Sequence, residues 1–302
     1  MRLKEKGCKG MICASAGNTA RAFSYFCGLE NFPLIVIVGK DHAERLYLPA
    51  NHPNKSVKLI VIEDGDYYDA KVFSKKISQH LDSWQMEGGI HNVARRDGIG
   101  SLIIDAAFTI GELPAHYFQG IGGGPGPVGV HEMANRLIEA ELFEGPVPRQ
   151  HVSQNEEHCP IHNAWQAKLP HLTDSDFPED EVEVFSDLLL NKAPAYQIKG
   201  GVYDILKESD GQTYIVSKED AKKAKTMFES IEGIDIMSPA AVALASLIQS
   251  LDSGDIGADD CTVLNISGGG VERMKSDMKI VQITPWKTVS KNDDVLTVLQ
   301  DL

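Results

Sequence analysis

The sequence predicts an α/β protein with mostly parallel sheets, because apolar, β-branched runs alternate with helical segments along the chain. Two runs indicate the strands: PLIVIVG at 33–39 and VKLIVIE at 57–63 are apolar almost without interruption. Such runs are typical of strands that are buried on both faces of a parallel sheet. The segment 66–81 indicates the helices, since its apolar residues recur at helical spacing.

The other elements follow the same alternation. A helix is expected over 18–28, where Gly28 is placed to act as a C-cap. Ser217 with Asp220 resembles a capping box, and Ser238 stands directly before a helix-opening proline. The remaining expected helices lie at 100–113, 128–143, 218–231 and 238–251, the remaining strands within 116–124, 149–154 and 261–267, and an acidic loop at 172–185.

Composition narrows the class of protein. The 302 residues can bury a substantial core, in one large or two modest domains. The formal net charge of −14 repels nucleic acid, and no apolar run approaches the roughly 20 residues of a membrane helix. We therefore expect neither nucleic acid nor a membrane as a partner. The cysteines are odd in number and irregularly spaced, which favours a reducing cytoplasm over a disulfide framework; they are Cys8, Cys13, Cys27, Cys159 and Cys261.

The stretch ICASAGNTARAF at 12–23 joins an apolar run to a predicted helix through the loop Ser15-Ala16-Gly17-Asn18-Thr19. Ser, Asn and Thr satisfy the free N–H groups at a helix start, so an ordinary helix cap is one interpretation. A ligand loop is the other, because ligands of α/β proteins bind at the carboxyl ends of strands. Both interpretations remain open from this stretch alone.

The segment GIGGGPGPVGV at 120–130 places a glycine-rich loop between a strand and a helix. Glycines let the backbone approach a ligand closely, and the helix start offers free N–H groups to a phosphate. The pattern therefore favours a phosphate site over a plain flexible loop. A dinucleotide fingerprint is the competing interpretation, but Pro125 interrupts its spacing, and no acidic residue follows at the expected distance.

Two further segments carry weaker signals. NISGGG at 265–270 offers the hydroxyl of Ser267 at a strand end, where it could bond a heterocycle or simply form a turn. Cys159 and His162 in HVSQNEEHCPIH have a zinc-ligand spacing, but no second cluster supplies the remaining ligands. No metal is therefore expected, and no elbow sequence supports a Ser-His-Asp triad.

Taken together, these segments resemble the fold type II pyridoxal-phosphate enzymes, in particular the branch of threonine synthase and cysteate synthase. The matching motifs are CASAGNTA at 13–20, GGGPG at 122–126 and LNISGGG at 264–270, and VSQNEEHCPI at 152–161 resembles a further family segment. Their order and separation agree with the family over almost the whole chain. The resemblance implies a two-domain α/β architecture with twisted, mostly parallel sheets flanked by helices, and pyridoxal 5′-phosphate as cofactor.

The resemblance also implies a domain organisation and partners. A smaller α/β domain at 1–95 would carry the Ser-x-Gly-Asn-Thr loop, and a larger α/β domain at 96–302 would carry the glycine-rich loop. The larger domain is expected to lack its N-terminal part. A small phosphorylated amino acid is implied as the substrate, and a homodimer as the assembly.

The resemblance assigns roles to residues of the three loops. Asn18 would bond the 3′-oxygen of the cofactor, and Ser267 would face its pyridine nitrogen. A neutral hydroxyl there would leave the pyridine largely unprotonated, which suits elimination and replacement over transamination. The cofactor phosphate would lie against Gly122, Gly123, Gly124 and Gly126, the substrate carboxylate against Ser15, Ala16, Gly17 and Thr19, and a substrate phosphate against Asn92, Arg95 and Arg96, for which surface solvation is the alternative.

Within this branch the ending NISGGGVER resembles the cysteate synthases, because threonine synthases usually have Thr at the position of Ser267. The resemblance implies a transferase that replaces the phosphate of O-phospho-L-serine with sulfite, giving L-cysteate for coenzyme M biosynthesis in the cytoplasm. Threonine synthase, a lyase acting on O-phosphohomoserine, is the alternative within the same chemistry. A non-catalytic, lysine-less relative is the alternative from another class, and a dinucleotide oxidoreductase is more distant.

One departure from the family concerns its Schiff-base lysine, which lies upstream of the Ser-x-Gly-Asn-Thr loop. Lys4, Lys6 and Lys9 precede that loop here but lack the family's Ser-Phe-Lys-like setting, so no catalytic lysine is assigned. The chain is expected to be either an N-terminally truncated form of a longer enzyme or a naturally lysine-less protein.

We predict that this chain by itself is inactive or severely impaired, because removal of the α-proton loses its usual agent. The measurements are the absorbance band of lysine-bound pyridoxal phosphate and the release of phosphate from O-phospho-L-serine. Detecting both with this chain would contradict the prediction. The codons upstream of Met1 would separate truncation from natural loss of the lysine.

Overall fold

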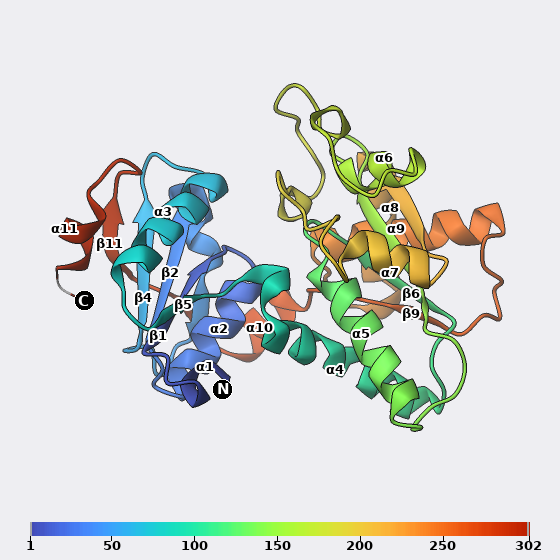
Figure 1. The fold of residues 1–302 in the computed structure, drawn as a ribbon, viewed down its shortest axis with the longest axis horizontal. Helices are drawn as coiled ribbons and strands as arrows, with labels where there is room; N and C mark the ends of the chain where they lie inside the picture. Colours follow the sequence, from blue (N-terminus) through green and yellow to red (C-terminus); the bar gives the residue numbers. More distant parts are fainter. Residues whose placement is uncertain (1, 301) are drawn as a thin grey trace. The chain divides into compact units, whose positions relative to one another are not determined.

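The computed structural model describes residues 2–300 and 302, and the chain divides into two compact units. The first unit combines Met1–Gly88 with Met274–Leu302, and the second is Gly89–Arg273. Each unit contains a parallel sheet flanked by helices (Figure 1). Within the described residues, no helix is long and apolar enough to cross a membrane.

The main sheet of the first unit is parallel throughout. Successive residues of β2 point to opposite faces, because Leu34 and Val36 join one apolar cluster while Ile35 and Ile37 join the other. This burial on both faces confirms the prediction made from the uninterrupted apolar run. In spatial order the strands are β11 (Pro285–Val289), β4 (Val57–Ile62), β2 (Leu34–Gly39), β1 (Gly10–Ala14) and β5 (Trp84–Met86).

Helices cover both faces of this sheet. Phe73 and Ile77 of α3 (Tyr67–His80) pack with the isoleucines of one face, and Ala20 and Cys27 of α2 (Asn18–Leu29) pack on the other. Asp66 and Asp69 form a capping box at the start of α3, with hydrogen bonds of 2.9 and 3.0 Å. The smaller elements are α1 (Arg2–Glu5), η1 (Lys40–Arg45), α11 (Val295–Leu299) and the antiparallel pair β3 (Tyr47–Pro49) and β10 (Ile280–Gln282).

The expectation that Gly28 caps α2 is wrong. Gly28 is a buried residue inside the helix, and the C-cap is Glu30 in a right-handed conformation. A Cβ on Gly28 would stand 2.1 Å from the carbonyl oxygen of Pro53. The glycine therefore permits the close approach of segment 52–53 to the helix, a long-range contact with no local sequence signal.

The second unit is built on a parallel sheet with α5 and α9 packed against it. In spatial order its strands are β8 (Gln212–Val216), β7 (Arg149–Asn155), β6 (His116–Gly120) and β9 (Thr262–Leu264). Its helices are η2 (Gly89–His91), α4 (Val93–Ile110), α5 (Pro125–Glu139), α6 (Pro160–Gln166), η3 (Asp174–Asp176), η4 (Asp187–Leu189), α7 (Val202–Glu208), α8 (Lys218–Glu232) and α9 (Ser238–Ser253), and α10 (Val271–Asp277) spans the boundary between the units.

Two helices of the second unit, α8 and α9, were predicted to begin at capping residues. The hydroxyl of Ser217 accepts the N–H of Asp220 at 3.1 Å, which confirms the predicted cap of α8. The expectation that Ser238 caps α9 is wrong, because Met237 is the N-cap and Ser238 is the first helical residue. The hydroxyl of Ser238 instead lies 3.0 Å from the hydroxyl of Ser186, and thereby joins the helix start to a distant loop.

The compact units differ from the expected domain boundaries mainly at the C-terminal end. The segment Met274–Leu302 belongs to the first unit, whereas the resemblance implied one domain at 96–302. The physical reason is strand pairing: β11 joins the sheet of the first unit alongside β4, and Lys58 places its ammonium 4.1 Å from the ring centre of Trp286. The other division between the compact units falls between Gly88 and Gly89.

A chain of buried and half-buried polar side chains runs through the second unit. Nδ1 of His116 lies 2.9 Å from Nε2 of His151, and Nδ1 of His151 lies 2.8 Å from the hydroxyl of Tyr214, which donates to Ser250 at 3.1 Å. The ring of His151 also stacks on Phe118. Burial, with smaller contributions from the nearby His116 and Arg149, lowers the pKa of His151 to about 3.

This histidine should make the stability of the protein sensitive to acid. Its pKa is lower in the folded state than the ordinary value of 6.5, so unfolding takes up a proton between those values. Stability is then complete above pH 6.5 and falls by about 1.4 kcal/mol per pH unit below it. Denaturant unfolding between pH 7 and pH 4.5 measures this slope. The slope should be shallower in the variant His151→Phe, and an equal slope in both proteins would contradict the assignment.

Candidate active site

The Ser15–Thr19 loop lies in the first unit, between the end of β1 and the start of α2. The N-cap of α2 is Gly17, which has no side chain to cap the helix. Ser15 accepts a 3.4 Å hydrogen bond from the N–H of Gly17, and the amide oxygen of Asn18 accepts one from Arg21. Capping by a Ser, Asn or Thr at the N-cap position therefore does not explain this loop.

Arg21 organises the surroundings of that loop. Its guanidinium lies 4.6 Å from the ring centre of Tyr47, donates to the Tyr47 hydroxyl, and also donates to Asn18. Asn18 itself is exposed, whereas its loop neighbours are half-buried. Half-buried backbone N–H groups at a helix start are suited to a carboxylate, since the helix dipole favours negative charge there.

The glycine-rich loop lies in the second unit, between the end of β6 and the start of α5. Gly124 is the N-cap of α5 and has a left-handed conformation, with φ of +83°. The first N–H of α5 with a backbone acceptor is that of Val128, which donates to the carbonyl oxygen of Gly124 at 3.4 Å. Within the described residues, the preceding backbone N–H groups donate to no other backbone group; they belong to Gly122, Gly123, Gly124 and Gly126. These donors fit the phosphate of pyridoxal phosphate, because each can bond a phosphate oxygen.

Close contacts explain why these positions are glycines. A Cβ on Gly122 would stand 3.0 Å from the carbonyl oxygen of Leu189, and one on Gly126 would stand 2.2 Å from the side chain of Gln119. A Cβ on Gly124 would stand 2.2 Å from Val202. The loop is thus held between η4, α7 and the sheet, which fixes the direction of its N–H groups.

The NISGGG segment lies beside this loop's sheet, at the carboxyl end of β9. The strand is shorter than expected. The N–H of Asn265 still donates to the carbonyl oxygen of Phe118 in β6, but the N–H of Ser267 donates to the carbonyl oxygen of Asn265 at 3.0 Å, so the chain turns away from the sheet there. The side-chain amide of Asn265 donates to the buried hydroxyl of Tyr117 at 2.8 Å. Ser267 is half-buried at this strand end, and its role toward the pyridine nitrogen stays a prediction.

The predicted phosphate-binding residues near the start of α4 have structural contacts within the second unit. Asn92 is the N-cap of α4 and accepts the N–H of Arg95 at 3.3 Å. Arg96 donates to Glu132 at 2.8 Å, which links α4 to α5, and also donates to the carbonyl oxygen of Ile90. Contact with a substrate phosphate therefore stays a prediction for these residues.

Cys159 and His162, which have the zinc-ligand spacing, and the neighbouring His158 have other partners. His158 lies 3.3 Å from the carbonyl oxygen of Asn191, and His162 lies 2.9 Å from the hydroxyl of Thr213. Cys159 makes weak contacts with Glu156. Among the described residues no group of three or more His, Cys, Asp or Glu side chains could hold a metal ion.

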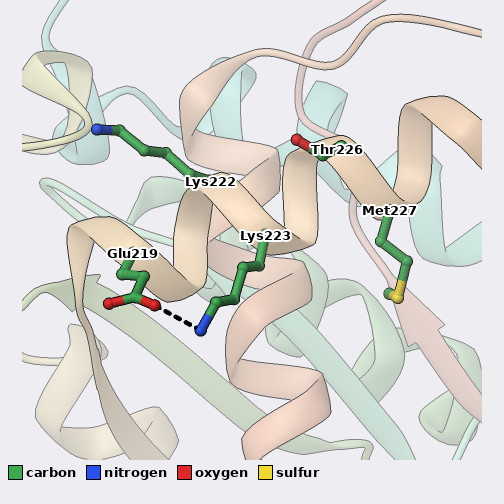
Figure 2. A pocket seen from close by; sticks show the side chains of 5 residues that line it. All are labelled: Glu219, Lys222, Lys223, Thr226 and Met227. Carbon is green, nitrogen blue, oxygen red and sulfur yellow. Dashed lines mark ion pairs between the residues drawn. The ribbon is translucent and has the colours of Figure 1, made fainter.

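Figure 2 shows an open hollow on the surface of the second unit, which is formed by side chains of α8 alone. Glu219 and Lys223 form an ion pair of 2.7 Å one turn apart, and both are exposed. The hollow contains no predicted site residue, and its side chains are those of a solvated helix face; they are Glu219, Lys222, Lys223, Thr226 and Met227.

Comparison with solved structures defines the fold. The chain is similar to a fungal L-serine ammonia-lyase from Rhizomucor miehei, with a TM-score of 0.69 and 15% identity over 92% of this chain and 85% of that chain. It is also similar to serine racemase from Dictyostelium discoideum, with a TM-score of 0.63 and 17% identity over 89% of this chain and 78% of that one. The fold is therefore that of the fold type II pyridoxal-phosphate enzymes, as predicted.

The chain belongs to the family described as "Pyridoxal-phosphate dependent enzyme", which matches residues 1–268. It is 41% identical to cysteate synthase of Methanosarcina barkeri over 97% of this chain and 71% of that protein. It is 42% identical to cysteate synthase of Methanosarcina acetivorans over 99% of this chain and 72% of that protein. It is 43% identical to cysteate synthase of Methanocella arvoryzae over 94% of this chain and 69% of that protein. The predicted family, the enzymatic class and the pyridoxal-phosphate cofactor are thereby confirmed.

The segment 186–191 packs against the glycine-rich loop, and its role there was not predicted from the sequence. Asn155 at the end of β7 fixes this segment, because its side-chain amide donates to the carbonyl oxygen of Ser186 and accepts the N–H of Ser186, both at 3.0 Å. Asn155 could have been found from its place at a strand end. The segment itself has no periodicity or motif that marks it.

Substitution of Gly124 should separate backbone strain from crowding. Gly111 is the matched control, since it has a similar φ of +93° but open space around a Cβ. Gly111→Ala should lower the free energy of unfolding by about 1–2 kcal/mol through backbone strain alone. Gly124→Ala should lower the free energy of unfolding by about 1–3 kcal/mol more than Gly111→Ala does, because the added Cβ overlaps the side chain of Val202. Equal losses in denaturant unfolding would contradict the crowding at the start of α5.

Proposed function

We propose that this protein carries out a pyridoxal-phosphate-dependent β-replacement that converts O-phospho-L-serine and sulfite into L-cysteate and phosphate. The observation that carries the proposal is the identity of 41–43% with three cysteate synthases over 94–99% of this chain. In this reaction the bond between Cβ and the phosphate oxygen breaks, and phosphate leaves with the electron pair. Sulfite then forms the new C–S bond, while the α-proton is removed and returned.

The loop of the first unit is proposed to hold the amino-acid end of the substrate. The backbone N–H groups and hydroxyls at the start of α2 would bond its α-carboxylate, and Asn18 would bond the 3′-oxygen of the cofactor. The exposure of Asn18 and the absence of a capping side chain on Gly17 support these roles. The carboxylate is assigned to Ser15, Ala16, Gly17 and Thr19.

The glycine-rich loop of the second unit is proposed to hold the cofactor phosphate. Bound pyridoxal phosphate would supply the electron sink for loss of the α-proton. The free N–H groups of Gly122, Gly123, Gly124 and Gly126 support this assignment. Ser267 would offer a neutral hydroxyl to the pyridine nitrogen, and Arg95, Arg96 and Asn92 remain candidates for the substrate phosphate.

The cellular setting of the reaction is also proposed. None of the five cysteines, which all lie within the described residues, forms a disulfide, and this suits a cytoplasmic enzyme of coenzyme M biosynthesis. The partner is a small phosphorylated amino acid, and assembly as a homodimer stays a prediction.

The proposal is tested by product analysis with the chain, pyridoxal phosphate, sulfite and O-phospho-L-serine, with methylamine added to replace the unassigned lysine as a base. We expect formation of L-cysteate and phosphate above the background of cofactor and amine without protein. Omission of sulfite should abolish cysteate, and O-phosphohomoserine should give no threonine.

Each other outcome overturns the proposal in favour of a stated alternative. Threonine formed from O-phosphohomoserine, with no cysteate from O-phospho-L-serine, would identify a threonine synthase. Tight binding of pyridoxal phosphate in equilibrium dialysis without turnover of either substrate would identify a non-catalytic relative, provided that the codons upstream of Met1 encode no segment with the family's lysine.

A further inference from the structure

The side-chain amide of Asn191 lies directly beside the glycine-rich loop. Its Nδ2 atom is 2.8 Å from the point at which a Cβ on Gly123 would stand. Both residues belong to the second unit, but they come from segments separated by α5, β7, α6, η3 and η4. Gly123 therefore leaves room for a polar group of another segment.

The orientation of this amide follows from its hydrogen bonds. Oδ1 of Asn191 accepts the N–H of Ala193 at 3.0 Å, so the oxygen must be the atom that faces Ala193. The NH2 group is then the end that faces Gly123. Within the part of the chain that the structure describes, this NH2 group donates to no acceptor, although it carries two N–H donors.

The backbone on both sides of this amide is fixed. The carbonyl oxygen of Asn191 lies 3.3 Å from Nε2 of the buried His158, and a carbonyl can only accept, so Nε2 must carry the hydrogen. Upstream, Asn155 holds Ser186 through two hydrogen bonds of 3.0 Å. The amide is therefore held in place before any ligand binds, which lowers the entropic cost of using it.

The start of α5 has a shortage of donors that such an amide would relieve. Pro125 and Pro127 occupy the first turn of α5 and carry no N–H. A phosphate monoester has three terminal oxygens, each of which can accept more than one hydrogen bond. The backbone of the first turn alone offers fewer donors than a helix start without proline.

We propose that the side-chain amide of Asn191 donates a hydrogen bond to the cofactor phosphate held by Gly122–Gly126. The inference rests on the proposed role of the glycine-rich loop and adds a side-chain ligand from the segment 186–191. The donor is neutral, so it binds the phosphate by geometry and by polarity, without a full positive charge.

The test is equilibrium dialysis of pyridoxal phosphate and of pyridoxal, which lacks the phosphate, with the 302-residue chain and with Asn191→Asp. This variant keeps the oxygen that accepts the N–H of Ala193 but replaces the donor with a carboxylate. We expect the dissociation constant for pyridoxal phosphate to rise about tenfold or more, as for the loss of one charge-assisted hydrogen bond. The dissociation constant for pyridoxal should change less than about twofold, because that ligand has no phosphate oxygen to bond.

Two further variants exclude other causes. Lys192→Gln changes the net charge by the same amount at the adjacent, exposed position, and it should bind pyridoxal phosphate like the unaltered chain. Asn191→Leu removes the donor without adding a charge, and it should also weaken binding of pyridoxal phosphate. If circular dichroism shows that Asn191→Asp does not fold, the binding of pyridoxal phosphate by Asn191→Leu tests the role of Asn191 instead.

The outcomes distinguish this inference from the proposed function. If the unaltered chain prefers pyridoxal phosphate to pyridoxal and the Asn191 variants bind like it, only the role of Asn191 is overturned. An equal loss of affinity for pyridoxal phosphate in Lys192→Gln would also overturn the role of Asn191, since the change in net charge would then explain the effect. If the unaltered chain shows no preference for pyridoxal phosphate, the phosphate loop and the proposed function fail together. Competition by O-phospho-L-serine with the same sensitivity to Asn191→Asp would assign the amide to the substrate phosphate instead.

Discussion

Close approach of backbone segments at the turn after β6 is the constraint on which the candidate phosphate site depends. The sheet, η4 and α7 all reach this turn, and none leaves space for a side chain at Gly122, Gly124 or Gly126. The left-handed conformation of Gly124 then turns the chain into α5, whose first N–H groups donate to no backbone carbonyl of the described residues. The same contacts that exclude side chains therefore hold the donors in place, so packing and binding impose one requirement on these positions.

Neutral amides organise the surroundings of that turn. Gln154 at the end of β7 accepts the N–H groups of Ile161 and His162 at 3.0 and 3.1 Å and so begins α6. The side-chain amide of Asn155 makes two hydrogen bonds with the backbone of Ser186, and Oδ1 of Asn191 accepts the N–H of Ala193. Burying amides costs less than burying charges when every bond is made. A protein with a net charge of −14 can thereby present hydrogen-bond donors to an anion without a buried cation.

Much of the fold could be predicted from the sequence, because the signals are local. The apolar runs at 33–39 and 57–63 became β2 and β4, and the cap of Ser217 formed as expected. The failures concern residues whose role depends on a distant partner: Gly28 on segment 52–53, and Ser238 on Ser186.

The same distinction applies to the candidate site. The glycine-rich loop has a local pattern that predicts donors at a helix start. The segment 186–191 has none, because its place beside the loop is set by the amide of Asn155 and by contact with Gly122. A single sequence carries no record of such a contact between segments.

The connectivity of the first unit has a consequence for biosynthesis. Its sheet needs β11 beside β4, yet the whole second unit lies between these strands in the sequence. During translation the second unit leaves the ribosome as one continuous piece and can fold while synthesis goes on. The first unit must wait with β4 as an open edge until Pro285–Val289 emerges. The first unit is therefore completed only after the whole second unit has been synthesised, and in that interval the exposed edge of β4 is open to pairing with other chains.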